Sequence, residues 1–96
     1  MFVVTLTYLT DLDRADAAMA DHLAWVDRQY ADGVFLASGR RVPRTGGVIL
    51  AAGLDRADLD RRLATDPFAE QGIAGYEVVE FVAGRVAEGL EAIREG

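Results

Sequence analysis

The sequence has no cysteine and no lysine, and each absence excludes a class of chemistry. Without cysteine there is no disulfide, no thiolate nucleophile and no Cys-ligated zinc site. All ten basic residues are arginine, so only the N-terminal amine is available for Schiff-base chemistry. No apolar run approaches the ~18 residues of a membrane span, and no basic leader precedes the first apolar segment. We therefore expect a cytoplasmic protein without a membrane segment.

Positive charge is scarce and dispersed. The formal net charge is −6, and arginines alternate with aspartates in segments such as 55–62, DRADLDRR. Binding to nucleic acid requires a basic stripe, so we expect no nucleic-acid partner. One histidine and scattered carboxylates argue against a built-in metal site. Because no GxGxxG or Walker motif is present either, we expect no cofactor.

Periodicity in the chain predicts four strands and two helices. Segments rich in β-branched and aromatic residues predict strands at 2–9, 34–38, 47–52 and 76–82. Helices are predicted at 13–33, which ends at a glycine, and at 55–64, which ends before an Asp-Pro pair. Between these elements we expect a polar loop at 39–46 and a short turn or helical coil at 66–72.

The order β-α-β-β-α-β predicts an α+β, ferredoxin-like fold in which two helices cover one face of an antiparallel sheet. Its 96 residues form a single domain, in which residues 84–96 are a C-terminal tail with a weak helix. The first strand is apolar on both sides, so its uncovered face requires a partner. We expect two sheets to stack face to face in a homodimer.

The first predicted helix carries the only histidine of the chain. His22 falls on an apolar stripe whose other members are Ala15, Ala18, Met19, Val26 and Tyr30. A histidine in this position is either a core residue with satisfied hydrogen bonds or a functional group. Trp25 lies just off the stripe and is assigned to packing of the helix or of the dimer.

Five segments, in this order and spacing, resemble the YCII-related (YciI-like) family of small bacterial proteins across nearly the whole chain. They are His22, the segment 30–39 (YADGVFLASG), the segment 44–47 (RTGG), the segment 66–68 (DPF) and the segment 76–81 (YEVVEF).

The resemblance implies a ferredoxin-like dimeric α+β barrel and an enzyme with a His–Asp pair. One branch of the family is linked to the elimination of chloride from hydroxylated aromatic rings. The chain departs from the family pattern at Arg40, where many relatives have proline after the Ser-Gly pair.

Two aspartates compete for the role of partner to His22. Asp32 lies ten residues further along the same predicted helix, about 15 Å away at 1.5 Å per residue. Asp66 follows the second helix, and the two helices run in the same direction across the sheet. Because Asp66 and His22 lie at similar distances from the starts of their helices, we expect them to meet. The alternative for Asp66 is a cap of the turn that follows it.

An aspartate that accepts from one ring nitrogen leaves the other as a general base. We therefore take His22 and Asp66 as candidate catalytic residues. Ser38 is a candidate for substrate binding, although a serine at the end of a strand commonly bonds to backbone. The only basic cluster of the chain lies in the polar loop and consists of Arg40, Arg41 and Arg44. These arginines can hold an anionic substrate. Their presence is explained equally well by solvation of the loop or by salt bridges between subunits.

These residues lead to two hypotheses. In the first, the chain is a small cytoplasmic enzyme, a lyase or isomerase, that transfers protons on a small anionic or aromatic metabolite. In the second, the same dimer is a non-catalytic module that binds a ligand or another protein. A water-accessible cavity beside His22 favours the first, and a sealed histidine ring favours the second.

Overall fold

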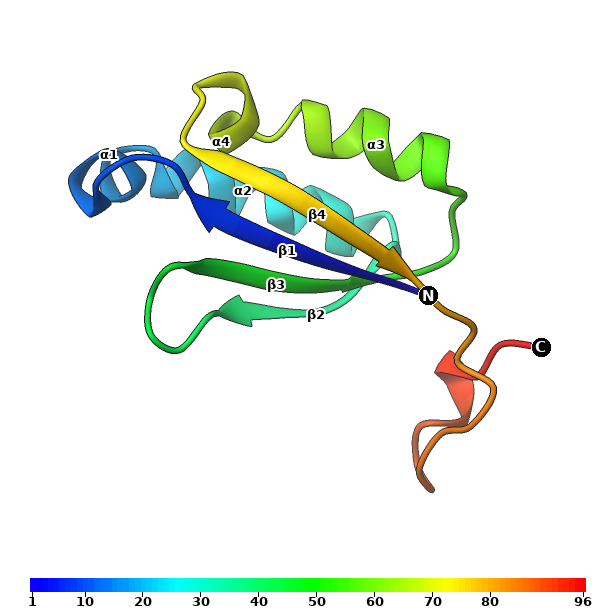
Figure 1. The fold of residues 1–96 in the computed structure, drawn as a ribbon. Helices are drawn as coiled ribbons and strands as arrows, with labels where there is room; N and C mark the ends of the chain where they lie inside the picture. The colour runs from blue at the N-terminus through cyan, green and yellow to red at the C-terminus, as the bar shows by residue number, and fades with distance from the viewer.

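The computed structural model describes residues 1–96 as two layers, a sheet and a set of helices (Figure 1). The strands form one sheet in the order β2-β3-β1-β4, and every neighbouring pair is antiparallel. The ferredoxin-like topology predicted from the sequence is therefore confirmed. The strands are β1 (Phe2–Tyr8), β2 (Phe35–Arg40), β3 (Gly46–Ala51) and β4 (Ala74–Glu80).

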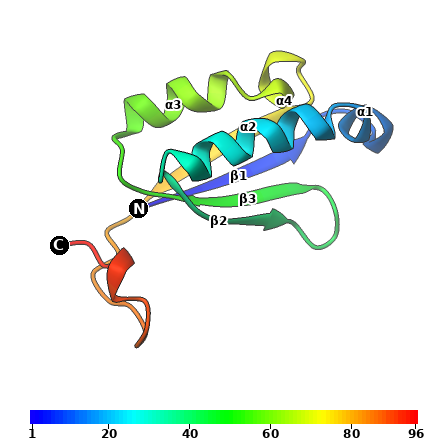
Figure 2. The ribbon, with the colours of Figure 1, turned by 180° about the vertical axis from the view of Figure 1, so that it is seen from behind.

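All helices lie on one side of this sheet, in front of it in Figure 2. Asp11, Asp55 and Asp66 each cap a helix by accepting a hydrogen bond from a backbone N–H of its first turn. None of the helices has the length and apolar content that a membrane crossing requires. The helices are α1 (Leu12–Ala17), α2 (Met19–Ala31), α3 (Arg56–Ala64) and α4 (Pro67–Glu70).

The predicted helix 13–33 is wrong in one respect, because it is two helices that meet at Ala18. Ala18 has φ −98° and ψ 1°, outside the helical range, and neither glycine nor proline marks this position in the sequence. The buried face of α2 is correspondingly rotated. Trp25 and Gln29 are buried, whereas Tyr30, predicted to face the core, is 39% exposed.

The loop and the tail also differ from the prediction. Strand β2 continues through Arg40, so residues 39 and 40 belong to the strand and not to the loop. The helix predicted in the tail is wrong: only a 3₁₀ turn, η1 (Glu91–Ile93), forms there, after Gly89 with a positive φ of 95°. Glu95 holds the tail by accepting hydrogen bonds from the N-terminal ammonium at 2.7 Å and from the Ala83 N–H at 3.0 Å.

The core lies between the sheet and the helices. Alternate residues of β1, namely Phe2, Val4 and Leu6, point toward the helices and are at most 3% exposed. The other face of the sheet has no covering layer (Figure 1). One cross-strand row on that face is apolar on all four strands and consists of Ala37, Leu50, Val3 and Val79.

Candidate functional site

His22 and Asp66 are in direct contact where α2 passes the start of α4. The ring Nδ1 of His22 lies 2.8 Å from Asp66 Oδ1. Asp32 bonds to Arg62 at 2.8 Å instead. Because a carboxylate oxygen only accepts, the neutral ring carries its proton on Nδ1 and keeps the lone pair of Nε2 free.

Local sequence explains why Asp66 is available at this point. Proline at 67 disfavours helical angles at Asp66, which is extended at φ −62° and ψ 128°. Pro67 then starts α4, where its missing N–H costs nothing. The Phe68 N–H donates to Asp66 Oδ1 at 3.0 Å. Asp66 thus caps α4 and contacts His22 at the same time, so the two alternatives considered for it coexist.

Tyr76 is the third group that bonds to Asp66. Its hydroxyl donates to Oδ2 at 2.5 Å. The Asp66 side chain, 0% exposed, therefore receives three donors, from His22, Phe68 and Tyr76. Sequence reasoning did not identify Tyr76. The available signal was the alternation of the last strand, which places Tyr76 on the side opposite Glu77 and Val79.

Burial raises the pKa of Tyr76, and the hydrogen bond to Asp66 and its negative charge raise it further. The folded protein therefore binds the phenolic proton more tightly than the unfolded chain does. The stabilisation is complete below the ordinary tyrosine pKa of about 10 and is lost as the pH rises above it. Because the chain lacks lysine, tyrosines are the main side chains that titrate between about pH 10 and 12.

We expect Tyr76→Phe to lower the free energy of unfolding at pH 7 by about 1.5–3 kcal/mol, since it removes a hydrogen bond to a charged group. We also expect the variant to lose most of the alkaline destabilisation of the parent. Urea unfolding at several pH values between 7 and 11.5 measures both effects. Tyr30→Phe is the control and should keep the parental pH dependence. An alkaline loss in Tyr76→Phe equal to that of the parent would contradict this account.

The His22 ring is fixed on its faces as well as at Nδ1. It stacks on Phe68, with ring centroids 4.0 Å apart and planes 3° apart. The Trp25 ring lies 6.0 Å away, and its Nε1–H donates to Thr65 at 3.0 Å. The His22 side chain is 12% exposed.

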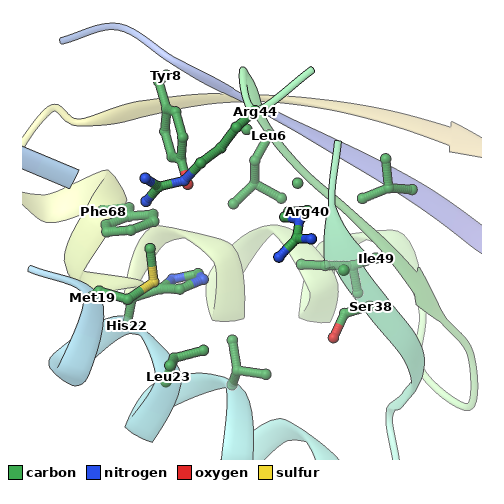
Figure 3. A pocket seen from close by; sticks show the side chains of 15 residues that line it. Leu6, Tyr8, Met19, His22, Leu23, Ser38, Arg40, Arg44, Ile49 and Phe68 are labelled. Atoms are coloured by element: carbon green, nitrogen blue, oxygen red, sulfur yellow. The ribbon is translucent and has the colours of Figure 1, made fainter. Parts of the chain in front are cut away.

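His22 lines a cavity of about 590 Å³ between α2 and the strands β2 and β3 (Figure 3). This volume is within the range of about 300–1,000 Å³ that is typical of small-molecule sites. Figure 3 shows Arg40 and Ser38 on the strand side, across the cavity from His22 and Met19. The walls are largely apolar and include Leu6, Met19, Leu23, Val26, Ile49 and Phe68.

The structure separates the three arginines that the sequence grouped together. Arg44 lines the cavity and forms an ion pair with Asp16, whose hydrogen bond raises the pKa of Arg44. Arg41 is not part of the cavity lining, and its guanidinium donates to Thr7 at 3.1 Å on the opposite face of the sheet. Arg40 lines the cavity and has no side-chain hydrogen bond or ion pair.

Ser38 also lines the cavity and lies two residues before Arg40 on β2. Its Oγ lies 2.7 Å from the hydroxyl of Tyr30, a residue that sequence reasoning assigned to the core. The structure contains no group of three or more His, Cys, Asp or Glu side chains with the arrangement of a metal site. The polar groups of the cavity are therefore an imidazole, hydroxyls and guanidinium groups.

Comparison with known proteins places the chain in a family. The model of the YCII-related domain matches residues 1–82. The chain belongs to the YCII-related family. No curated protein matches the sequence.

A solved structure similar to this YCII-related chain is the 5-chloro-2-hydroxyhydroquinone dehydrochlorinase of Burkholderia phenoliruptrix AC1100, in complex with 2,5-dihydroxybenzoquinone. The TM-score is 0.72 over 88% of this chain and 96% of that chain, with 17% sequence identity. At this identity the similarity establishes a shared fold.

Proposed function

We propose that this chain is an enzyme in which His22, oriented by Asp66, acts as general acid and base on a small molecule in the cavity. The observation that carries the proposal is the 2.8 Å contact between His22 Nδ1 and Asp66 Oδ1. Nδ1 is committed to a buried carboxylate, while the ring that holds Nε2 lines a cavity of ligand size. A general base needs a free lone pair at a place that a bound molecule can occupy, and this arrangement offers Nε2 for that role.

The chemistry that follows is a lyase or isomerase reaction. Nε2 takes a proton from a C–H or O–H of the bound molecule, and the electron pair left behind forms a new double bond. In an elimination that pair expels a leaving group; in an isomerisation the imidazolium returns the proton to another atom. The Asp66 carboxylate stabilises the imidazolium between these steps. No thiol or lysine is needed.

Two observations support a ring-shaped ligand. The cavity is bounded by Leu6, Ile49 and Phe68, which suit a flat apolar body. The dehydrochlorinase that shares the fold is named for a chlorinated hydroxyhydroquinone and was solved with a dihydroxybenzoquinone. We therefore propose an aromatic or quinone-like substrate class for this chain.

Proton transfer can be tested before the natural substrate is identified. A metabolite library is screened for compounds that raise the unfolding temperature, and the hits are incubated with the protein in D₂O. We expect solvent deuterium to enter at least one hit, or a product to form, with rates that depend on His22. If hits bind but wild type gives no deuterium incorporation and no product, the chain is a binding module; if wild type and His22→Gln react at the same rate, His22 is not the base.

We also propose that the chain acts as a homodimer through the uncovered face of the sheet. The apolar row described above crosses all four strands, and its Val79 is 61% exposed. An exposed apolar sheet face of this kind is typical of an association surface. A second copy of the same face would cover it by a two-fold arrangement.

Val79→Glu should dissociate this dimer, since it places a charge in the apolar row that the second copy would cover. Analytical ultracentrifugation should give twice the 10.4 kDa chain mass for the parent and the chain mass for the variant. Val42→Glu is the matched control, because Val42 is 91% exposed in the loop between β2 and β3. A monomeric parent, or a dimer that survives Val79→Glu, would contradict the proposal.

A further inference from the structure

Strand β2 brings a hydroxyl and a guanidinium to the cavity at consecutive inward positions. Ser38 pairs with Ile49 and Arg40 with Gly47, and all four residues line the cavity. The alternation of the strand therefore directs both polar side chains toward the space in front of His22. Figure 3 shows them on the wall that faces the histidine.

Of the two arginines that line this cavity, Arg40 is the one whose charge is not neutralised by a carboxylate. Arg44, the other arginine of the lining, is paired with Asp16. Asp66 does not neutralise Arg40 either, because it is buried behind His22 and bonded to three other donors. In an acidic chain of net charge −6, a free guanidinium directed into an apolar cavity is a specific attraction for one negative charge.

Ser38 is prepared to donate in the same direction. Its Oγ and the Tyr30 hydroxyl share one hydrogen bond of 2.7 Å. When Tyr30 donates to Ser38, the Ser38 proton is free to point at a ligand. Tyr30 in turn packs edge-on against Phe35, with centroids 6.0 Å apart, so its position is fixed by the core. Tyr30 is thus a positioning residue for Ser38.

We propose that the ligand of this cavity is an organic monocarboxylate, with its carboxylate bound by Arg40 and Ser38 and its apolar body directed toward Phe68 and His22. A planar carboxylate accepts two parallel bonds from one guanidinium, and the serine hydroxyl serves a remaining lone pair. A phosphate dianion would leave charge unmatched, because only Arg40 is uncompensated. Binding of the carboxylate by Arg40 and Ser38 depends only on the residues of the cavity. The placement of the other end of the ligand beside His22 rests on the proposed function.

The test is a binding experiment with two probes that share one ring system, 2-naphthoate and its neutral analogue 2-naphthamide. Titrations followed by ¹H–¹⁵N NMR give the dissociation constants and the residues that respond. We expect 2-naphthoate to bind at least about tenfold more tightly than 2-naphthamide and to perturb residues of the cavity. Equal affinities, or no response of the cavity to 2-naphthoate, would overturn the proposal.

Adjacent arginines provide the matched variants. Arg40→Gln should weaken 2-naphthoate binding about tenfold or more and leave 2-naphthamide binding unchanged. Arg41→Gln removes the same charge from the other face of the sheet and should leave both affinities unchanged. Equal losses in the two variants would mean a general charge effect and would overturn the proposal, as would tighter binding of naphthyl phosphate than of 2-naphthoate.

Two further variants complete the design. Tyr30→Phe should weaken 2-naphthoate binding about threefold and have no effect on 2-naphthamide, as expected for the loss of one neutral hydrogen bond. His22→Gln should retain the preference for the carboxylate. Because this readout is binding and not turnover, failure of the carboxylate site and failure of the proposed catalysis give different results.

Discussion

Asp66→Ala is expected to lower the free energy of unfolding by about 3 kcal/mol or more, since each buried donor that is left without an acceptor costs about 1–3 kcal/mol. The physical reason is the set of donors around the carboxylate. The Tyr76 hydroxyl, the Phe68 N–H and the His22 Nδ1–H all lose their acceptor in a site that water does not reach. Urea unfolding at one protein concentration measures the change, followed by fluorescence of Trp25, the single tryptophan.

Two controls separate this effect from the loss of a helix cap. Asp55→Ala removes the cap of α3, where one backbone N–H donates at 2.8 Å, and should cost about 1 kcal/mol. Asp66→Asn keeps an acceptor for His22 and Phe68, and the Tyr76 hydroxyl can rotate to accept from the amide. It should therefore be much more stable than Asp66→Ala. Equal costs for Asp66→Ala and Asp55→Ala would show that the buried network contributes nothing.

His22→Gln is expected to reduce the proton-transfer rate on a bound substrate by about 10²–10⁴-fold, the usual contribution of a general base. Glutamine can still donate to Asp66 but has no basic nitrogen at the position of Nε2. Ligand affinity should change little, so the loss should appear in kcat and not in KM. The measurement is the rate of deuterium incorporation or product formation at saturating ligand.

The control for this variant is the preceding residue of the same helix. Asp21 is exposed on the surface of α2, and Asp21→Asn should leave the rate unchanged. Wild-type rates in His22→Gln, with the ligand still bound in the cavity, would exclude His22 as the base.

The sequence predicted the topology because its strands have clear periodicity. The run of β-branched residues in β1 and the alternation of side chains in β4 are typical of strands and do not follow the period of a helix. The break at Ala18 was not predictable, since alanine favours helix and no breaker is nearby. In the tail, by contrast, a helix breaker is present in the sequence. The apolar spacing indicated a helix, but Gly89 adopts a left-handed conformation there and the helix does not form.

The candidate site was predictable only in part. Helix direction brought Asp66 near His22 without any structural data. The partners of Asp66 were not visible, because the contact between Tyr76 and Asp66 depends on a side chain crossing from β4 to the start of α4. The arginines could not be separated either. Whether Arg40, Arg41 or Arg44 faces the cavity depends on how far β2 continues, and sequence-based boundaries are least certain at strand ends.

In the proposed mechanism, Asp66 holds the proton of the neutral His22 ring on Nδ1 and leaves Nε2 unprotonated. Long-range ¹H–¹⁵N NMR of the imidazole tests this directly, and the spectrum is unambiguous because the chain has one histidine. We predict, at a pH where the ring is neutral, an ¹⁵N shift of the protonated type for Nδ1 and of the unprotonated type for Nε2. A ring protonated on Nε2 would contradict the account, because the nitrogen that faces the cavity would then have no lone pair with which to act as a base.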